Sequence, residues 1–444
     1  MSRYTVAILS PYFPPSTLAG VHRARHLAKH LPSFGWQPII LCVDEAFHEE
    51  TLDPGLARLL PSDIEVIKTA ALPAQLTRPV KIGDITIRAF RQLRSALFEL
   101  IQTRPIDVIL ITGAPYYAMM LAPEIKRRTG PPVVLDFQDP WVSSWGALQS
   151  TYSKSGLAHR LASALEPRAV RAAAFITSVS ETQNAEMALR YPWLDRKNMA
   201  AIPIGGDPED FKLLRASPIE CAAHPLDPSR INLSYVGTCL PRAEPVMRVL
   251  FRAAARFRAT HPDVAQKLRL NFVGTSNQPN ERATRVVTDF AEAEGVGDMI
   301  SETPFRVPYL QAIDILARSD GLLLIGSDEP HYTASKIYPA LMSGRPYLSI
   351  FYRASSSNEI LSLAGGGESF SFATLGELET QEAAIAKGLA TLVIRPQSMS
   401  RVDHSAFAAY EANSIASRFA DIFNAVASRA PKSNSVGDFS CVSP

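Results

Sequence analysis

Short apolar runs alternate along the chain with longer segments in which apolar residues recur every three or four positions. In the first half the short runs lie at residues 4–9, 38–43, 64–68, 108–112, 133–136 and 175–178. Between them, segments such as 21–31 and 84–103 place their apolar residues on one helical face. This alternation of strands and helices predicts a doubly wound parallel sheet.

The pattern breaks between Gly205 and Arg230, where Pro, Gly and Asp are frequent, and then restarts. Later strand-length runs lie at 232–236, 268–273, 321–325 and 346–350, with helical patterns at 246–257, 282–293, 310–317, 378–394 and 407–427 and a turn at "AGGGESF". We expect Rossmann-like domains at 1–205 and 231–400, a linker at 206–230, a helix at 401–428 and a disordered tail at 429–444. Ligands bind at the carboxyl ends of such strands, so we expect the site in a cleft between the two domains.

Composition narrows the function classes. The 444 residues carry a formal net charge of +2, which gives no global argument for a nucleic-acid partner. The four cysteines are scattered without metal-like spacing, no apolar run reaches membrane-spanning length, and the first residues form a strand pattern rather than a signal peptide. We expect a cytoplasmic protein, at most attached to the inner face of the membrane, with no metal site.

Two loops that follow predicted strands of the first half carry candidate chemistry. In "SPYFPPSTLAGVHRARH", Gly20 meets a helix N-terminus and His22 and Arg23 follow, which suits an anion or equally a solvated helix face. In "VVLDFQDPWVSSWG", Asp136 and Asp139 end a strand close to Trp141. Carboxylates and aromatic rings suit a sugar acceptor, but a helix cap and a core tryptophan explain the same residues.

A third loop, "LSYVGTCLPRAEPVMR", runs from a strand into Gly237 and Thr238, with Arg242 four residues after the turn. A small-residue turn and a guanidinium suit a pyrophosphate, although a surface arginine after an ordinary turn remains open. The P-loop pattern GxxxxGK[ST] is absent, and no GxGxxG follows the first strand, which counts against a nicotinamide cofactor.

Residues 84–104 form a basic amphipathic pattern, with arginines around an apolar face of Phe90, Leu93, Leu97 and Leu100. Such a helix can lie on an anionic bilayer. A helix packed on the core with solvated arginines fits the same pattern.

The order of motifs resembles a glycosyltransferase of the GT-B fold, family 4 type, over roughly residues 4–370. The opening "SPYFPPSTLAGVHRARHLAKHLPSFGWQPIIL", the "VVLDFQDPW" segment similar to one bacterial branch, "AIPIGGDPEDF", "LSYVGT" and "SKIYPALMSGRPYL" carry the resemblance. It implies two Rossmann-like domains facing a cleft and transfer of a sugar from a nucleotide-sugar donor to a glycan or lipid-linked acceptor in polysaccharide biosynthesis. It also implies retention at the anomeric carbon and no metal or other cofactor.

The resemblance assigns roles residue by residue. Gly237, Thr238 and Arg242 would hold the diphosphate, with Lys336 as a second cation. Asp139 would orient the acceptor. The remaining donor-site expectations are Gly20, Gly274, Thr275, Phe305, Val307, Glu329 and Ser335, and the remaining acceptor-site expectations are His22, Arg23, Asp136 and Trp141.

One departure from the family pattern concerns the donor's ribose. Pro339 and His331 stand where the resemblance implies a pair of glutamates, leaving Asp328 or Glu329 as substitutes. If Ser335 caps the helix, Pro339 falls at the end of its first turn and the helix survives. Two alternatives to a transferase stay open: a catalytically degenerate binding module of the same fold, and a sugar-nucleotide epimerase.

Overall fold

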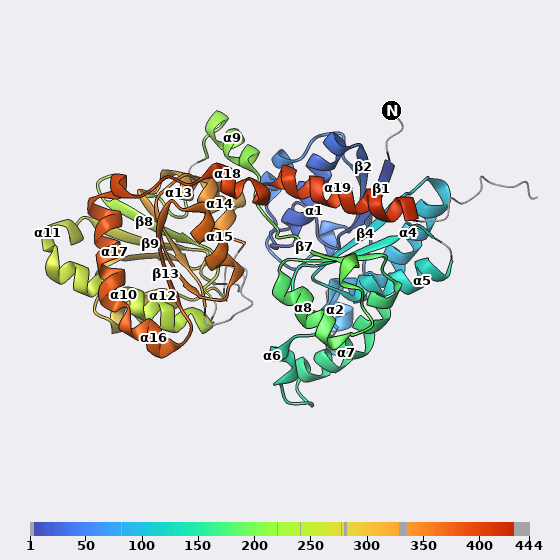
Figure 1. Ribbon diagram of the computed structural model, residues 1–444, viewed down its shortest axis with the longest axis horizontal. Coiled ribbons are helices and arrows are strands. Elements are labelled where there is room, and N and C mark those ends of the chain that lie inside the picture. The colour runs from blue at the N-terminus through green and yellow to red at the C-terminus, as the bar shows by residue number, and fades with distance from the viewer. Residues whose placement is uncertain are drawn as a thin grey trace, which may run out of the picture.

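The computed structural model describes residues 4–429 except 81, 129, 220, 240, 277, 279–281 and 328–334. Within them the chain forms two α/β domains side by side (Figure 1). The first sheet has the order β3-β2-β1-β4-β5-β6-β7 and the second β10-β9-β8-β11-β12-β13, and their paired strands run parallel.

The strands are short, and those inside each sheet are almost fully buried, whereas the edge strands are partly exposed. They are β1 (Tyr4–Leu9), β2 (Trp36–Val43), β3 (Glu65–Thr69), β4 (Val108–Gly113), β5 (Val133–Phe137), β6 (Phe175–Ser178), β7 (Met199–Ala201), β8 (Ile231–Val236), β9 (Leu268–Val273), β10 (Ile300–Thr303), β11 (Gly321–Ile325), β12 (Tyr347–Tyr352) and β13 (Gly367–Phe372). Continuous apolar runs fit parallel strands because helices cover both faces of such sheets.

The helices fill the connections between strands. They are α1 (Val21–His30), α2 (Ala74–Thr77), α3 (Ile85–Arg88), α4 (Phe90–Thr103), α5 (Ala122–Arg127), α6 (Ser144–Ala147), α7 (Lys154–Ala172), α8 (Glu181–Arg190), α9 (Pro208–Ala216), α10 (Glu244–Thr260), α11 (Pro262–Ala265), α12 (Val287–Ala293), α13 (Tyr309–Arg318), α14 (Ile337–Met342), α15 (Ser356–Ala364), α16 (Leu375–Thr380), α17 (Glu382–Ile394), α18 (His404–Phe407) and α19 (Ala412–Arg429). The α/β class with two parallel sheets, expected from the sequence, is confirmed.

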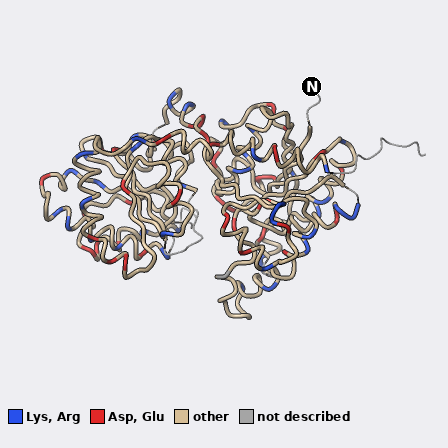
Figure 2. Tube along the Cα trace, viewed as in Figure 1, with Lys and Arg blue, Asp and Glu red and all other residues tan. Residues whose placement is uncertain are grey.

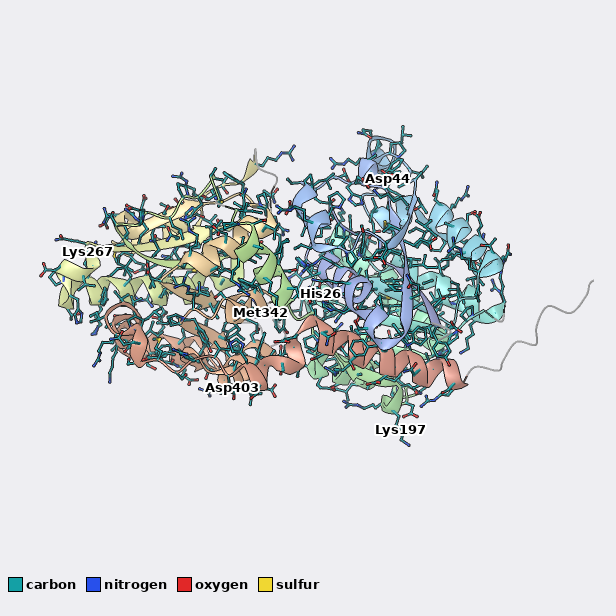
Figure 3. All side chains as sticks on the ribbon, turned by 90° about the horizontal axis from the view of Figure 1, so that it is seen from above. His26, Asp44, Lys197, Lys267, Met342 and Asp403 are labelled. Carbon is teal, nitrogen blue, oxygen red and sulfur yellow. The ribbon has the colours of Figure 1, made fainter. Side chains whose placement is uncertain are left out.

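The chain crosses twice between the domains, and the two crossings lie side by side. Gly206 forms a parallel bridge with Glu411, in which the Gly206 amide donates to the Tyr410 carbonyl at 3.1 Å and the Ala412 amide donates to the Gly206 carbonyl at 2.7 Å. Helix α19 then packs along the first domain, where Phe419 and Phe423 join the core around Trp36 (Figures 1 and 3). The last helix of the chain therefore completes the first domain.

Several boundaries differ from the expectation. Strand β13 occupies most of the segment expected to turn, because Gly367 pairs with Tyr347 and the strand is an edge with few apolar residues. Strands β7 and β10 were missed because they are only three and four residues long and lie at sheet edges. The segment expected to be linker contains α9, whose N-cap Asp207 accepts from the Glu209 amide. Pro339 is the third residue of α14, where a backbone N–H has no partner within the helix.

The amphipathic pattern at 84–104 serves the core. Leu93, Leu97 and Leu100 of α4 are buried in the first domain, and Arg88 is buried and donates to backbone carbonyls. Arg94 pairs with Glu124. The apolar face is therefore covered by protein, which removes the basis for membrane contact through this helix. Among the described residues, no helix combines the length and apolarity needed to cross a bilayer.

Candidate functional site

A pocket of about 220 Å³ lies between the two domains. Its lining residues from the first domain are Thr17, His22 and Leu56, and those from the second are Val236, Gly237, Thr238, Val273, Gly274, Arg306, Val307, Tyr309 and Ala312. Most of the second-domain residues follow the carboxyl ends of β8, β9 and β10, the edge at which open α/β sheets bind ligands.

Two glycines shape the second-domain wall. Gly237 and Gly274 directly follow β8 and β9, and their φ angles are 137° and 72°, values that residues with a Cβ rarely adopt. The Gly237 amide donates to the Val273 carbonyl and the Gly274 amide to the Thr303 carbonyl, so hydrogen bonds fix both turns. The wall is therefore lined closely by backbone, as phosphate-binding turns are.

Lys336 lies against the Gly237 turn. Its ammonium donates to the Tyr235 hydroxyl and stands 4.2 Å from the centroid of that ring. A Cβ added at Gly237 would lie 3.2 Å from the Lys336 Cδ. The structure thus places the cation that the sequence singled out beside the turn that it was expected to serve, just outside the pocket lining.

Arg306 is the cation that lines the pocket, and the sequence reasoning missed it while naming its neighbours Phe305 and Val307. Its guanidinium donates to the Thr17 carbonyl at 3.0 Å, which ties the second domain to the first-domain loop. Burial lowers the pKa of Arg306, although a guanidinium stays charged in proteins. Arg306 therefore brings a positive charge to the pocket. It belongs to the same domain as the two glycine turns and contacts the loop of the first domain.

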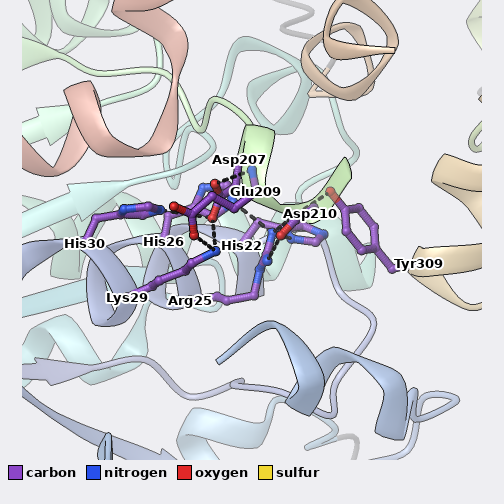
Figure 4. Close-up of polar contacts among 9 residues, drawn as sticks. All are labelled: His22, Arg25, His26, Lys29, His30, Asp207, Glu209, Asp210 and Tyr309. Carbon is purple, nitrogen blue, oxygen red and sulfur yellow. Dashed lines mark hydrogen bonds and ion pairs between the residues drawn. The ribbon is translucent and has the colours of Figure 1, made fainter. Parts of the chain in front are cut away.

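A polar network joins α1, α9 and α13 next to the pocket (Figure 4). Arg25 donates to both carboxylate oxygens of Asp210 at 2.8 and 2.7 Å, and the Tyr309 hydroxyl donates to the same carboxylate at 3.0 Å. Lys29 bonds Asp207 and Glu209, both at 2.8 Å. Burial alone would raise the pKa of Asp207, but hydrogen bonds from His30 and Lys29 hold it below its usual range. This network fixes the linker helix and the pocket wall against α1.

His22 lies beside this network. The Nη2 atom of Arg25 is 3.3 Å from His22 Nδ1, but it has closer partners in Asp210 Oδ2 at 2.7 Å and His26 Nε2 at 2.9 Å. Burial, with the Arg25 charge, lowers the pKa of His22 to about 3. His22 is thus a neutral imidazole in the pocket wall, with one ring nitrogen that donates and one that accepts.

Arg23 and Asp136 form an ion pair that is fully inaccessible to solvent. Arg23 Nε donates to Asp136 Oδ2 at 3.1 Å, and Thr112 and Thr177 donate to the same carboxylate, each at 2.7 Å. Arg23 also donates to the backbone carbonyls of Ile202 and Pro203. With every side-chain group engaged inside the protein, these two residues tie α1 to the sheet and offer no surface to an acceptor.

Asp139 behaves differently from Asp136. It follows β5 at an exposed position, and the Tyr116 hydroxyl donates to its backbone carbonyl at 2.8 Å. Desolvation by the surrounding protein raises the pKa of Asp139 to about 6. Trp141 is 8% exposed and stacks on Tyr116 at a ring distance of 5.5 Å, so it belongs mainly to the core.

The other expected residues are less central. Gly20 faces Gln138, whose Nε2 donates to the Gly20 carbonyl at 3.3 Å, and buried Thr275 donates to Glu302 at 2.6 Å. Three more lie outside the pocket lining: Arg242, Phe305 and Ser335. Asp328, Glu329 and His331 fall outside the described residues. Within the described part of the chain, no three His, Cys, Asp or Glu residues are grouped to hold a metal ion.

Comparison with known proteins gives a family for the first domain and a fold for the chain. Residues 19–205 match the model of the glycosyl transferase 4-like domain. The whole chain has the fold of solved GT-B glycosyltransferases. No curated protein sequence is significantly similar to it.

The solved structures with this fold span nearly all of the chain. HepE of Anabaena, in complex with UDP and glucose, is 13% identical with a TM-score of 0.60, covering 95% of this chain and 100% of its own. WaaG, a glycosyltransferase involved in lipopolysaccharide biosynthesis, is 12% identical with a TM-score of 0.59, covering 94% and 99%. Trehalose-6-phosphate synthase OtsA is 12% identical with a TM-score of 0.61, covering 94% and 98%.

Proposed function

We propose that this protein is a glycosyltransferase that moves a sugar from a nucleotide-sugar donor to a glycan or lipid-linked acceptor in polysaccharide biosynthesis. The observation that carries the proposal is the pocket between the domains, where two positive-φ glycine turns, Arg306 and the neutral His22 converge. Close backbone and a fixed guanidinium suit a diphosphate. HepE, which has the same fold, binds UDP and UDP-glucose, which supports a nucleotide sugar as the ligand here.

In the reaction, the bond between the anomeric carbon and the donor's phosphate oxygen breaks, and a bond from that carbon to the acceptor oxygen forms. Negative charge grows on the departing diphosphate while positive charge grows on the sugar ring. Arg306, with Lys336 beside the Gly237 turn, would stabilise the diphosphate, and fixed donors of this kind need no reorganisation during reaction. The neutral His22 ring would form a hydrogen bond with the nucleotide sugar. In a retaining reaction the leaving phosphate oxygen takes the acceptor proton.

The acceptor side is proposed around Asp139. A carboxylate whose pKa is about 6 is largely ionised at neutral pH and can accept a hydrogen bond from an acceptor hydroxyl. It stands at the carboxyl end of β5, on the cleft edge of the first sheet. The alternative acceptor residues Arg23 and Asp136 are sealed inside the domain.

The rival proposal is a degenerate module that binds a nucleotide without transfer, favoured by Pro339 and His331 in place of the family's glutamates. The test has two stages. Nucleoside diphosphates and UDP-, GDP- and ADP-sugars are screened by thermal stabilisation, in which a bound ligand raises Tm. The stabilising donor is then incubated with lipid extract, and nucleoside diphosphate release is measured.

Transfer gives a nucleoside diphosphate together with an enlarged lipid or glycan product. Stabilisation without release supports the degenerate module, and conversion of the donor to another nucleotide sugar supports an epimerase. If no donor or nucleotide raises Tm, the pocket is not a donor site and the proposal is wrong.

A further inference from the structure

The segment that follows β5 exposes large apolar side chains. Helix α6 and the first turns of α7 project at the end of the first domain away from α19 (Figure 1). The exposed fractions there are 55% for Trp145, 85% for Leu148, 90% for Tyr152, 53% for Leu157 and 45% for Leu161. Isolated exposed apolar residues are ordinary, but five large ones exposed within residues 145–161 mark an interaction surface. We call it the α6–α7 surface.

This surface is a folded element. Ser143 caps α6 by accepting from the Gly146 amide, and Ser153 caps α7 by accepting from the Gly156 amide. Helices α6 and α7 pack closely, because a Cβ on Gly146 would lie 2.6 Å from His159 Nδ1. Helix α7 also packs on the loop before it, because a Cβ on Gly156 would lie 2.1 Å from the Ser150 carbonyl oxygen. The apolar side chains are thus held outward by a defined backbone.

The exposed charges along this segment have one sign. Between Asp139 and Glu181 the exposed charged residues are basic: Lys154, Arg160, Arg168 and Arg171. The acidic residue in that interval, Glu166, is fully buried, bonded to Arg190 and Tyr191. Helical spacing puts the four basic residues on the same side of α7 as Leu157 and Leu161. Elsewhere charges of both signs are interspersed along the chain (Figure 2).

We propose that the α6–α7 surface binds an anionic lipid bilayer. Exposed Trp and Tyr at the tip suit the interface between headgroups and acyl chains, leucines suit the acyl boundary, and the basic stripe suits anionic headgroups. A protein partner or a second copy of this chain would more often be met by charges of both signs. This binding does not depend on the proposed function.

The surface also has a connection to the proposed acceptor side. Trp145 follows Asp139 by six positions, and the segment between them is anchored, because Trp141 is packed on Tyr116 and the Val142 amide donates to Glu166 at 3.1 Å. Docking through α6 would therefore hold the β5 end near the bilayer. If glycosyl transfer is the function, this placement favours an acceptor carried in the membrane.

The test is flotation of the full chain with two kinds of vesicle. One is phosphatidylcholine alone, and the other is phosphatidylcholine mixed with phosphatidylglycerol at roughly three to one, which makes the leaflet anionic. We expect binding to the anionic vesicles that weakens at high salt. The triple variant Trp145→Ser/Leu148→Ser/Tyr152→Ser and the charge variant Lys154→Glu/Arg160→Glu should each weaken binding at least about tenfold.

Matched controls come from the second domain, where Leu363 and Leu375 are exposed apolar residues and Lys267 is an exposed cation. Leu363→Ser/Leu375→Ser and Lys267→Glu should bind as the unaltered chain does, and thermal melts confirm that every variant folds. Three results would each overturn the proposal: no binding by the unaltered chain, full binding by both the triple variant and the charge variant, or a dimer in solution that the triple variant dissociates.

Discussion

Arg23 and Arg306 lie on opposite sides of the junction between the two domains, and the protein uses them differently. Arg23 has no exposed surface and is held by Asp136 and by two backbone carbonyls. Arg306 is half-buried, has one described hydrogen bond, to the Thr17 carbonyl, and lines the pocket. A buried guanidinium whose three nitrogens all donate to protein acceptors stabilises one arrangement of the fold, whereas one that faces a pocket can bind a ligand.

The same contrast holds for the carboxylates. Asp136 and Asp139 are three positions apart at the end of β5, yet Asp136 accepts from Arg23, Thr112 and Thr177 while the Asp139 side chain has no partner among the described residues. The buried charges of the first domain therefore hold α1 against the sheet. The second domain leaves backbone turns and a cation facing the cleft.

The largest expected effect is on stability, from the buried pair. Asp136→Ala leaves Arg23 charged and buried without its partner, and should lower the free energy of unfolding by about 3–5 kcal/mol. Urea denaturation measures this, and Asp139→Ala is the matched control, expected to change stability little. If the Asp136→Ala protein is as stable as the unaltered chain but no longer transfers sugar to the acceptor, the contrast between the two carboxylates is wrong.

The next largest effect concerns the donor. Arg306→Ala should weaken binding of a nucleoside diphosphate by about tenfold to a hundredfold, because it removes a charge-assisted hydrogen bond from the pocket. Titration calorimetry measures the affinity. Arg318→Ala, on the exposed side of α13 in the same domain, should bind as the unaltered chain does. Equal affinities for the two variants would contradict the role given to Arg306.

The glycine turn gives a matched pair. Gly237 and Gly344 both have positive φ, but a Cβ at Gly237 would meet Lys336, whereas one at Gly344 would meet nothing within 4 Å. Each alanine variant should lose about 1–2 kcal/mol of stability through backbone strain. Gly237→Ala should also lose nucleotide affinity, while Gly344→Ala should keep it. Thermal melts and titrations on both variants separate strain from ligand contact.

Asp139→Asn should lower the transfer rate about fivefold, the worth of one hydrogen bond of about 1 kcal/mol. In the unaltered protein the rate should fall as pH drops through about 6, where Asp139 protonates, and the variant should lose this dependence. Stability changes in the opposite sense. Because the folded-state pKa is raised, the stability that Asp139 contributes is lost as pH rises toward 6, so the variant should be no less stable at pH 7. A rate profile unchanged by the substitution would remove Asp139 from the site.

Much of the fold could be predicted from the sequence because buried parallel strands are continuous apolar runs. The strands at 175–178, 268–273 and 321–325 were predicted at their observed bounds. The missed strands β7, β10 and β13 are short or polar, and their pairing depends on a neighbouring strand rather than on their own pattern. The split of the expected last helix at Glu411 reflects the bridge to Gly206, a contact between residues far apart in the chain.

The site was predictable where backbone shape decides it and less so where side chains do. Gly237, Thr238, Gly274, Val307 and His22, all singled out from the sequence, meet in one pocket. The pairing of Arg23 with Asp136, which are 113 positions apart, depends on tertiary packing that no local pattern encodes. Arg306 was overlooked because its direction into the pocket is set by the loop after β10 and by the Thr17 carbonyl.

The smallest expected effect is at Pro339, where the sequence posed a question about the second-domain wall. As the third residue of α14 it needs no amide partner, so Pro339→Ala should cost less than about 1 kcal/mol, mainly by freeing the unfolded chain. A proline at the next position gives the contrast, because the Ala340 amide donates to the Lys336 carbonyl. Ala340→Pro breaks that bond and should cost about 3 kcal/mol or more. Equal thermal shifts for the two variants would mean that α14 begins at another residue. Lys336, which precedes α14, would then not lie beside the Gly237 turn.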